Sequence, residues 1–533
     1  MDEVHISDLS SWCNIDFNGV SNPLYQGAYL YINQTLISDL VIPSDVKEIK
    51  SLAFHGYHYL KSVSIPSNVT TIGKEAFQSC SGLYSITIPK SVTKIEEAAF
   101  AGCNLISIVV ESENKIYDSR DNCNAIIETS TNTLITAGRN TKIPNTVTAI
   151  GNYAFYGIRL LKSVTIPNSV VTLGKEAFFN CYELEDITIG SNVKMMDTAC
   201  FGNCYNLWIV NIQDLSSWCN IDFKGASSNP LYSSNSYKGG YLKISGSIIR
   251  DLAIPSNINE IKKYTFINCI GLTSVIVPAS VYKINESAFS GCTNLSNAYL
   301  YSNLDLNSAN FPETTKLHLT LNDNDKIDFD ASIANTYADL TYNRELAAGK
   351  YGTIMLPFIP DAESLDNFAF FALSSVDGNT LIFDEVQSPE ANTPYLYRLR
   401  SGKEATKITG DEMTISSTIA SPNISGWETI GSFSNQTIDC SAGDAYYYAI
   451  NANDNMLYNV VSKLNVKPYR AYFKGAMLSA SKLIIRTADN ETTMIDAVEV
   501  EDLAPIFYDL SGRQVVSPSK GIYIKNGKKV VVK

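Results

Sequence analysis

A phenylalanine that returns every 23 residues constrains this chain more than any other feature. It occurs in three runs, and a proline stands eleven residues before every member except Phe201, which Gly190 precedes. A period of this size is the signature of a solenoid, in which each unit buries its apolar face by stacking on its neighbours. The members are Phe54, Phe77 and Phe100; Phe155, Phe178 and Phe201; and Phe266 and Phe289.

The repeat unit contains one strand signal and one turn signal. Residues 66–88 read PSNVTTIGKEAFQSCSGLYSITI, and the second half alternates apolar and polar residues as a short strand does. The first half carries apolar residues at i, i+3 and i+4, which indicates an irregular or 3₁₀ turn on the opposite side. The proline after the strand ends it, because proline lacks an N–H. We therefore predict a mainly β fold with short helical turns.

Six of the 11 cysteines occupy one repeat position, three residues after the phenylalanine. Stacked coils would align them as a ladder of small buried side chains. Neighbouring rungs, about 4.8 Å apart, lie within the Cα range of a disulfide. Parallel side chains on stacked coils point the same way, however, so we expect free thiols. The ladder consists of Cys80, Cys103, Cys181, Cys204, Cys269 and Cys292.

Two inserts interrupt the period. The first, at 114–138, has turn clusters between short β runs and should form hairpin-like coils that continue the stack. The second duplicates the N-terminus, because DLSSWCNIDF at 8–17 and NPLY at 22–25 both recur. The inserts also supply large side chains that could anchor a partner, namely Trp12, Tyr25, Trp218 and Tyr232.

The 23-residue period ends after Leu300, and short β runs separated by turn residues follow at the spacing of a β-sandwich. The last segment reads as strands joined by glycine turns, with Asn526-Gly527 as a hairpin signal. We predict a solenoid over 1–320 with two inserts, a linker at 321–336, an antiparallel β-sandwich over 337–487, a linker at 488–504 and a small C-terminal β module over 505–533.

Charge and hydrophobicity argue against nucleic-acid binding and against a transmembrane helix. The formal net charge is −13 and no cluster of Lys and Arg precedes the extreme C-terminus, so binding of nucleic acid through its phosphates is not expected. No run of about 18 apolar residues exists, so no transmembrane helix is expected.

The opening residues, MDEVHISDLSSWC, do not have the pattern of a signal peptide. We expect the native N-terminus to be longer; the alternative is a protein that starts here and stays inside the cell.

The sequence carries no recognisable catalytic or metal-binding motif. The chain has no nucleophile elbow, P-loop or paired-carboxylate motif. His55 and His58 lack a third ligand and are expected to be exposed repeat positions. The aspartates at 323, 325 and 328 lack the glycine and final glutamate of a calcium loop, which favours a linker turn. We therefore predict no enzyme activity, no catalytic residue, no metal and no cofactor.

The outward positions of the strands are the candidate binding surface, on the concave face of the solenoid. They are mostly small hydroxyl residues, and they give a flat, weakly charged surface with few anchors of the kind that dominate interfaces. One interpretation is that Ser and Thr simply suit a parallel sheet; the other is a surface for an extended partner or a glycan. The positions are Ser62, Ser64, Ser85, Thr87, Ser163, Thr165, Asp186, Thr188, Ser274 and Ile276.

The repeat IPxxVxxIGxxAFxxCxxLxSVxIP closely resembles the leucine-rich repeats of BspA-like bacterial surface antigens over about residues 1–320. The segments YDSRDNCNAIIET and DLSSWCNIDF are also similar to segments of that family. YNRELAAGKYGTIMLPF and NTPYLYRL resemble a β-sandwich module of secreted proteins of Bacteroides-type anaerobes. The tail, YDLSGRQVVSPSKGIYIKNGKKVVVK, looks like the C-terminal sorting domains of those bacteria.

The resemblance implies a leucine-rich-repeat solenoid, export across the outer membrane and display on the cell surface. It also implies adhesion to host matrix proteins and to other bacteria. We expect a monomeric, non-enzymatic surface protein whose partner is a host extracellular matrix protein or a cell-surface protein or glycan. One alternative is a carbohydrate-binding accessory protein in which exposed aromatic side chains of the β-sandwich stack on sugar rings; an aromatic platform on the surface of that domain would favour it. Another is a structural surface component, which strong self-association would favour.

Overall fold

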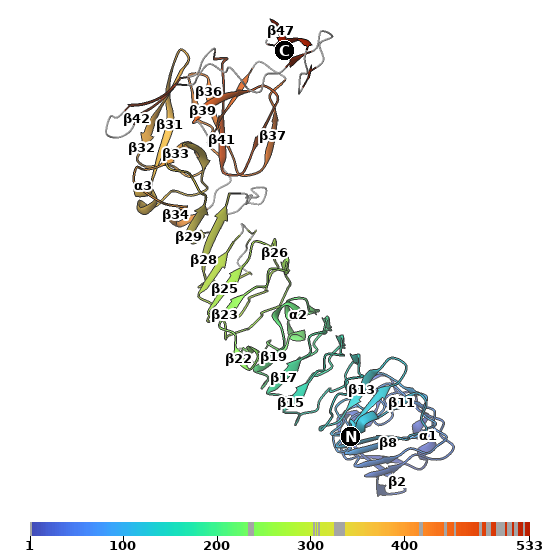
Figure 1. The fold of residues 1–533 in the computed structure, drawn as a ribbon. Coiled ribbons are helices and arrows are strands. Elements are labelled where there is room, and N and C mark those ends of the chain that lie inside the picture. Colours follow the sequence, from blue (N-terminus) through green and yellow to red (C-terminus); the bar gives the residue numbers. More distant parts are fainter. Residues whose placement is uncertain are drawn as a thin grey trace. The chain divides into compact units, whose positions relative to one another are not determined.

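The chain forms two compact units, Met1–Leu317 (unit 1) and His318–Lys533 (unit 2). The computed structural model describes the chain except residues 1–2, 233–238, 302–303, 305, 307–309, 324–335, 415–418, 442–444, 452–454, 479–481, 487–491, 497–506, 509–513, 516–520, 526–527 and 533. The predicted mainly β fold is confirmed, with stacked coils in unit 1 (Figure 1). Among the described residues, no helix has the length and apolar character needed to cross a bilayer.

Most coils of unit 1 carry one strand of three or four residues, here called the long strand, and on the opposite side one strand of two residues. The long strands pair in parallel within their ladders, and so do the short strands. The long strands are β4 (Asp39–Val41), β6 (Ser62–Ser64), β8 (Ser85–Ile88), β10 (Ser107–Val110), β15 (Ser163–Thr165), β17 (Asp186–Ile189), β19 (Ile209–Ile212), β21 (Tyr241–Ile244), β23 (Asp251–Ala253), β25 (Ser274–Val277) and β27 (Asn297–Leu300).

The second ladder was not predicted, because two residues are too few to show alternation in the sequence. Its strands are β5 (Glu48–Ile49), β7 (Thr71–Ile72), β9 (Lys94–Ile95), β14 (Ala149–Ile150), β16 (Thr172–Leu173), β18 (Met195–Met196), β20 (Asp222–Phe223), β24 (Glu260–Ile261) and β26 (Lys283–Ile284).

The turn around each repeat phenylalanine has a fixed backbone shape. The residue two places before each of the eight has φ between 50° and 66°, and the residue two places after has φ between 54° and 78°. The second position holds Gly, Asn or Ser, which tolerate or often visit this left-handed region. The N–H of a repeat phenylalanine, such as Phe54 or Phe77, donates to the carbonyl just before the next one, at 2.8 Å in both cases. The turns therefore stack through backbone hydrogen bonds.

The phenylalanine rings stack face to face through the middle of unit 1. All eight are buried, with exposed fractions of 3% or less. The ring centroids of neighbouring coils lie between 4.6 Å (Phe155 to Phe178) and 5.5 Å (Phe77 to Phe100) apart. The ladder extends one coil beyond the sequence period, because Phe311 stacks on Phe289 at 5.0 Å. The sequence period did not identify Phe311, because it lies 22 residues after Phe289 and not 23.

The six ladder cysteines are buried, and all 11 cysteines are free thiols. The Sγ of Cys80 donates to the carbonyl of Phe54, 26 residues earlier, at 3.1 Å, and Cys103, Cys181, Cys204 and Cys292 repeat this contact on their own coils. Each of these thiols thus donates to a backbone oxygen. Burial raises the pKa of Cys204 and of Cys269 to about 12.

We expect ten of the eleven thiols to be inert in the folded protein, because all but Cys440 are buried and a thiolate is the reactive form. Titration with a thiol reagent at pH 8 should modify at most one thiol quickly, and a Cys440→Ser variant should show none. Adding guanidinium should expose all eleven. Fast modification of several thiols before unfolding would contradict the buried ladder.

The first insert forms an antiparallel hairpin that joins the short-strand ladder. Its strands are β11 (Tyr117–Asp118), β12 (Ala125–Glu128) and β13 (Thr133–Ala137), with one 3₁₀ turn at Arg120–Asn122. β12 and β13 pair antiparallel, with a register shift between Ile126 and Ile127, and β13 pairs in parallel with β14. The insert therefore continues the stack, as the turn clusters indicated.

The duplicated segments each place a short helix and a tryptophan on the stack. The helices are α1 (Leu9–Cys13) and α2 (Leu215–Cys219), and their caps, Asp8 and Asp214, accept backbone N–H groups. The indole N–H of Trp12 donates to the carbonyl of Ala53 at 2.9 Å, and that of Trp218 to Thr265 at 3.0 Å. The prediction that these tryptophans could anchor a partner is wrong, because their exposed fractions are 5% and 1%.

Unit 1 also contains an N-terminal sheet, one further hairpin and three more 3₁₀ turns. The N-terminal sheet consists of β1 (Glu3–Ile6), β2 (Tyr29–Ile32) and β3 (Thr35–Leu36), and β22 (Ser247–Ile248) forms a hairpin with β21. The 3₁₀ turns lie at Gly19–Ser21, Pro23–Gln26 and Ala226–Ser228.

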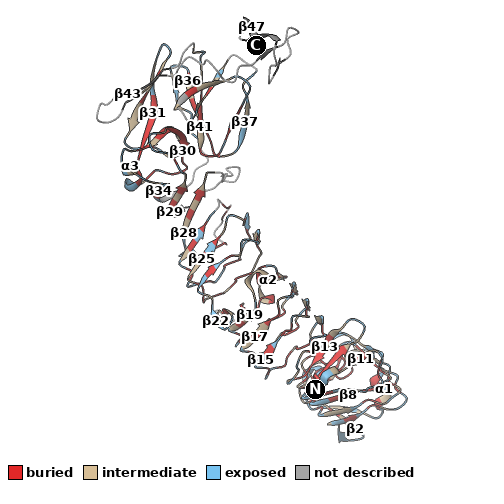
Figure 2. Ribbon diagram, viewed as in Figure 1, coloured by how far each residue is buried: buried red, intermediate tan, exposed pale blue. Residues whose placement is uncertain are grey.

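Unit 2 contains two larger sheets that share one core. Phe371, Phe383 and Leu396 of the first sheet pack in one cluster with Trp427 and Phe473 of the second. Figure 2 shows buried stretches along strands of both sheets. The first sheet has the order β30 (Gly352–Met355), β33 (Pro394–Leu399), β31 (Phe368–Asp377), β32 (Thr380–Val386), β42 (Lys482–Arg486) and β43 (Thr492–Asp496). The second has the order β35 (Asn423–Ile424), β36 (Trp427–Ser432), β41 (Arg470–Gly475), β38 (Tyr446–Asn451) and β39 (Met456–Val460).

Unit 2 departs from a purely antiparallel arrangement. β32 and β42 pair in parallel, which is possible because the chain between them is long enough for a crossover. β28 (Lys316–Asn322) and β29 (Thr336–Asn343) also pair in parallel. The other elements are α3 (Ala362–Asn367), β34 (Lys407–Thr414), β37 (Gln436–Asp439) and β40 (Lys463–Val466).

Both predicted linkers contain strand residues. β28 and β29 enter the linker at 321–336, whose residues 324–335 lie outside the described ones. β43 lies within the predicted linker at 488–504. The tail strands, β44 (Phe507–Tyr508), β45 (Gln514–Val515), β46 (Gly521–Lys525) and β47 (Lys528–Val532), form one antiparallel sheet. The domain limits stay a prediction.

Candidate functional site

The outward side chains of the long strands form two rows, which we call the long-strand face. In the central ladder the first row runs through Ser163, Asp186, Ile209 and Tyr241, one residue per coil. The second row runs through Thr165, Thr188, Asn211 and Lys243. Residues between the rows point into the core, because successive strand residues alternate between faces.

Within each ladder, the structure brings the ten predicted binding positions into these rows, all of them exposed or half-buried. The half-buried ones are Ser62, Asp186, Thr188 and Ser274; the exposed ones are Ser64, Ser85, Thr87, Ser163, Thr165 and Ile276. Whether these positions bind a partner stays a prediction.

Three carboxylates in the first row are held by neighbours on the adjacent strand. The hydroxyl of Ser62 donates to Asp39 at 2.5 Å, and that of Ser274 to Asp251 at 2.6 Å. The amide of Asn211 donates to Asp186 at 3.0 and 3.1 Å. Hydrogen bonds from Ser62 and then Ser38 lower the pKa of Asp39. These contacts fix the face before any partner arrives.

The long-strand face also carries apolar residues that the sequence interpretation omitted. Val41 is 67% exposed, Val109 48% and Tyr299 39%. All three occupy the second row, so the repeat register alone would have identified them: Val41 lies opposite Ser64, Val109 opposite Thr87 and Tyr299 opposite Ile276. The long-strand face therefore carries exposed apolar side chains among its Ser and Thr residues.

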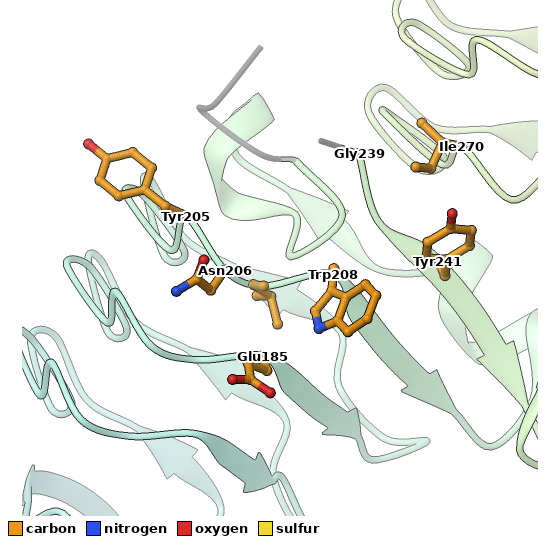
Figure 3. A pocket seen from close by; sticks show the side chains of 8 residues that line it. Glu185, Tyr205, Asn206, Trp208, Gly239, Tyr241 and Ile270 are labelled. Atoms are coloured by element: carbon orange, nitrogen blue, oxygen red, sulfur yellow. The ribbon is translucent and has the colours of Figure 1, made fainter. Parts of the chain in front are cut away.

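A cavity of about 510 Å³ opens beside this face, and we call it the Trp208 cleft. Its lining residues precede or begin three consecutive long strands, except for Ile270, which comes from a turn. In Figure 3 the Trp208 indole lies between Glu185 on one side and Tyr241 and Ile270 on the other. The lining consists of Glu185, Tyr205, Asn206, Leu207, Trp208, Gly239, Tyr241 and Ile270.

The second insert creates this cleft by placing two glycines where other coils have side chains. Ile209 lies opposite Tyr241, so Gly240 occupies the position of Trp208 on the next coil. A Cβ on Gly239 would clash with the carbonyl of Asn268, and a Cβ on Gly240 would approach Leu231 Cδ2 to 2.9 Å. The chain passes too close to its neighbours for a side chain at these two positions, and among the described residues no side chain fills the space beside Trp208.

Trp208 is the exposed member of the four tryptophans. Its exposed fraction is 48%, against 5%, 1% and 2% for Trp12, Trp218 and Trp427. Tyr205 is 41% exposed and stacks on Tyr182 of the preceding coil, with ring centroids 5.5 Å apart and planes within 2°. Trp208 stands at the repeat position that holds Tyr84 or Lys162 in other coils. Because this position varies between repeats, a single aromatic residue there does not by itself indicate a binding site.

Among the described residues, the contacts of His55, His58 and Asp323 are with neighbouring side chains of the same chain. The prediction that His55 is exposed is wrong: it is 9% exposed, because the ring of Tyr25 covers it at 4.9 Å. His58 contacts the hydroxyl of Ser81 at 3.1 Å. Asp323 binds Arg470 and accepts from Tyr342, while residues 325 and 328 lie outside the described ones. In the part of the chain that the structure describes, no three potential ligands gather.

Comparison with protein families gives one match. The model described as "BspA type Leucine rich repeat region" matches residues 21–128, 133–231 and 245–332, which is more than half of the chain. No curated protein matches the chain.

Solved structures similar to the chain come from several bacteria. A leucine rich cell surface protein of Faecalibacterium prausnitzii is 28% identical, with a TM-score of 0.35, over 52% of this chain and 63% of its own. The pneumococcal vaccine antigen PcpA is 18% identical, with a TM-score of 0.36, over 55% and 69%. A leucine-rich repeat protein of Bacteroides ovatus is 22% identical, with a TM-score of 0.31, over 53% and 84%. The chain thus spans less than two thirds of the Faecalibacterium protein.

Proposed function

Since the chain belongs to the BspA type leucine-rich repeat family, we propose that it is a non-enzymatic cell-surface recognition protein. Its repeat solenoid binds host matrix proteins or other cells, and unit 2 serves as spacer and export signal. Display on the surface rests on the resemblance of the tail to sorting domains. The antiparallel sheet of β44, β45, β46 and β47 is compatible with that role.

The observation that carries this proposal is the regular repetition of the two rows of the long-strand face within each ladder. Within a ladder, each coil adds one residue to each row in register with the coil before it. A partner that lies along the stack can therefore make the same weak contact with coil after coil. Many weak contacts on one rigid support give strong binding without any deep pocket, because later contacts form within one complex. Hydrogen bonds such as Ser62 to Asp39 hold the rows in place beforehand, which reduces the entropy lost on binding.

The test is binding of the full chain to immobilised fibronectin, fibrinogen, laminin and collagen at physiological salt. The informative variant carries Thr87→Arg, Thr165→Arg and Thr188→Arg, which place bulky side chains on the second row. We expect saturable binding to at least one matrix protein and a loss of about tenfold or more in the variant, as for truncated interface centres. A matched set with Glu in place of Arg separates bulk from charge.

The control variant carries Thr70→Arg and Thr93→Arg, two exposed positions beside the short strands β7 and β9. Its affinity should stay within about twofold of the parent, since surface changes away from an interface have small effects. Equal binding by the parent and the second-row variant would remove the long-strand face from the mechanism. Failure to bind any of the four matrix proteins would overturn protein adhesion.

A glycan-binding function is the second candidate, and the Trp208 cleft is the observation that favours it. The earlier alternative placed the aromatic platform on the β-sandwich, whereas in unit 2 Tyr448 is buried and Tyr446 is 36% exposed. The largest exposed aromatic group with a cavity beside it lies instead on unit 1, among the described residues.

A further inference from the structure

We propose that the Trp208 cleft is a binding site for neutral oligosaccharides. This proposal rests on the proposed function, because it names the ligand class of one part of the same recognition surface. Sugar rings have an apolar face of C–H groups and a rim of hydroxyls. A site for them needs an exposed aromatic face and a few polar groups in a shallow cavity, and the cleft offers these components together.

The aromatic face comes from Trp208, which is 48% exposed although its backbone is fixed within the stack. Its N–H donates to the carbonyl of Glu185 at 3.3 Å, and its carbonyl accepts from the N–H of Tyr241 at 2.7 Å. The indole therefore projects from a rigid ladder into a cavity of about 510 Å³, within the usual range of about 300–1,000 Å³ for small-molecule sites. A ring stacked on it loses apolar surface to water at little conformational cost.

The polar groups are Glu185 and Asn206. Both side chains are exposed, and among the described residues neither makes a hydrogen bond or an ion pair. The carboxylate accepts and the amide both donates and accepts, so together they suit hydroxyl groups, which do both. Because they are unpaired, a ligand gains their hydrogen bonds without breaking bonds inside the protein.

Charge and ring spacing select among possible ligands. Glu185 is the charged residue of the lining, in a chain of net charge −13, so sulfated or carboxylated glycans are disfavoured. A quaternary ammonium group would need aromatic rings that close around it as a cage. The rings of Tyr205, Trp208 and Tyr241 make no ring contact with one another among the described residues, and Tyr205 is instead stacked on Tyr182. Spread rings suit an extended neutral ligand.

The position of Trp208 makes the test specific. The other three tryptophans are buried, so a change in intrinsic fluorescence on adding a sugar, or protection from acrylamide quenching, reports on this cleft. The full chain should be titrated with soluble yeast mannan, laminarin, galactan and xylo-oligosaccharides, and with heparin and choline as comparison probes. We expect a saturable blue shift and protection with at least one neutral probe, and none with heparin or choline.

The chain offers a matched control. Tyr84 occupies the same coil position as Trp208, immediately before β8, and is also 48% exposed, but it does not line the Trp208 cleft. By an assay independent of fluorescence, such as calorimetry, Trp208→Ala should weaken sugar binding by about tenfold or more. Glu185→Ala should weaken it in the same direction, whereas Tyr84→Ala should leave it unchanged. Equal unfolding midpoints would show that each variant is folded.

Three results would overturn the proposal: no neutral probe binds, binding survives Trp208→Ala, or choline binds in place of the sugars. Fibronectin and fibrinogen binding measured on the same variants separates this proposal from protein adhesion. Matrix binding without sugar binding would reject the cleft alone. Sugar binding that requires Trp208, without matrix binding, would reject protein adhesion alone.

Discussion

Replacing Phe178 by alanine should lower the free energy of unfolding of unit 1 by about 3–5 kcal/mol, the cost of removing a large aromatic side chain from a packed core. Phe178 is fully buried and stacks on both sides, on Phe155 at 4.6 Å and on Phe201 at 5.1 Å. Neither neighbour can move into the space, because both are held by their own coils. In a solenoid the loss weakens two interfaces at once.

Urea unfolding followed by far-ultraviolet circular dichroism measures this effect. Phe178→Leu keeps most of the volume and serves as the matched control, with an expected cost of about 1 kcal/mol. A cost below about 1 kcal/mol for the alanine variant would contradict a continuous phenylalanine stack. So would equal effects of the alanine and leucine variants.

Replacing Asp323 by alanine should destabilise unit 2 by about 3 kcal/mol, near the low end for a broken buried ion pair. Asp323 is bound by Arg470 and accepts from the hydroxyl of Tyr342 at 2.5 Å, while Nε of Arg344 lies 3.9 Å away. The side chains of Arg470 and Arg344 are 19% and 10% exposed. The alanine variant would leave both guanidinium groups poorly solvated. The cost falls at the low end because the Asp323 side chain is itself 32% exposed to solvent.

The same ion pair makes the stability of unit 2 depend on pH. Burial opposes ionisation of Asp323, but the hydrogen bonds from Tyr342 and Arg470 outweigh it, so its pKa is lowered from 3.8. A lowered pKa means that the stabilisation is complete above about pH 4 and is lost as the pH falls through the lower, folded-state value. The stability difference between the parent and Asp323→Asn should therefore shrink below pH 4.

Trp427 makes the measurement specific, because it is the tryptophan of unit 2 and is 2% exposed. Its fluorescence should be followed in a Trp12→Phe, Trp208→Phe, Trp218→Phe background, so that it reports unit 2 alone. A pH-independent difference, or no difference at pH 7, would show that Asp323 does not hold Arg470 in solution.

The sequence was sufficient to predict the repeats because one constraint recurs in every coil. A 23-residue spacing of Phe, with Cys three residues later, leaves few ways to stack the chain, and both residues are buried in the structure. The two-residue strands and Phe311 escaped prediction for the opposite reason. Two residues show no alternation, and a spacing of 22 from Phe289 breaks the pattern although the ring still reaches the stack.

Burial of single residues outside the repeats could not be predicted, because it depends on contacts distant in sequence. Trp12 is covered through its bond to the carbonyl of Ala53, and His55 through the ring of Tyr25. The Trp208 cleft has the same origin: it exists because Gly239 and Gly240, more than 30 residues away, bring no side chains to the next coil. Composition and repeat spacing do not reveal where a missing side chain leaves a cavity on the neighbouring coil.

The central claim is that recognition occurs on the long-strand side of unit 1, and hydroxyl-radical footprinting of the full chain tests it directly. Oxidation should be compared in the free chain and in the chain saturated with fibronectin or fibrinogen. Tyr84 and Tyr299, 48% and 39% exposed on the long-strand side, should be protected in the complex. Tyr282, 69% exposed and adjacent to the short strand β26, should be oxidised equally in both. Protection of Tyr282 instead, or protection confined to residues 318–533, would contradict the claim.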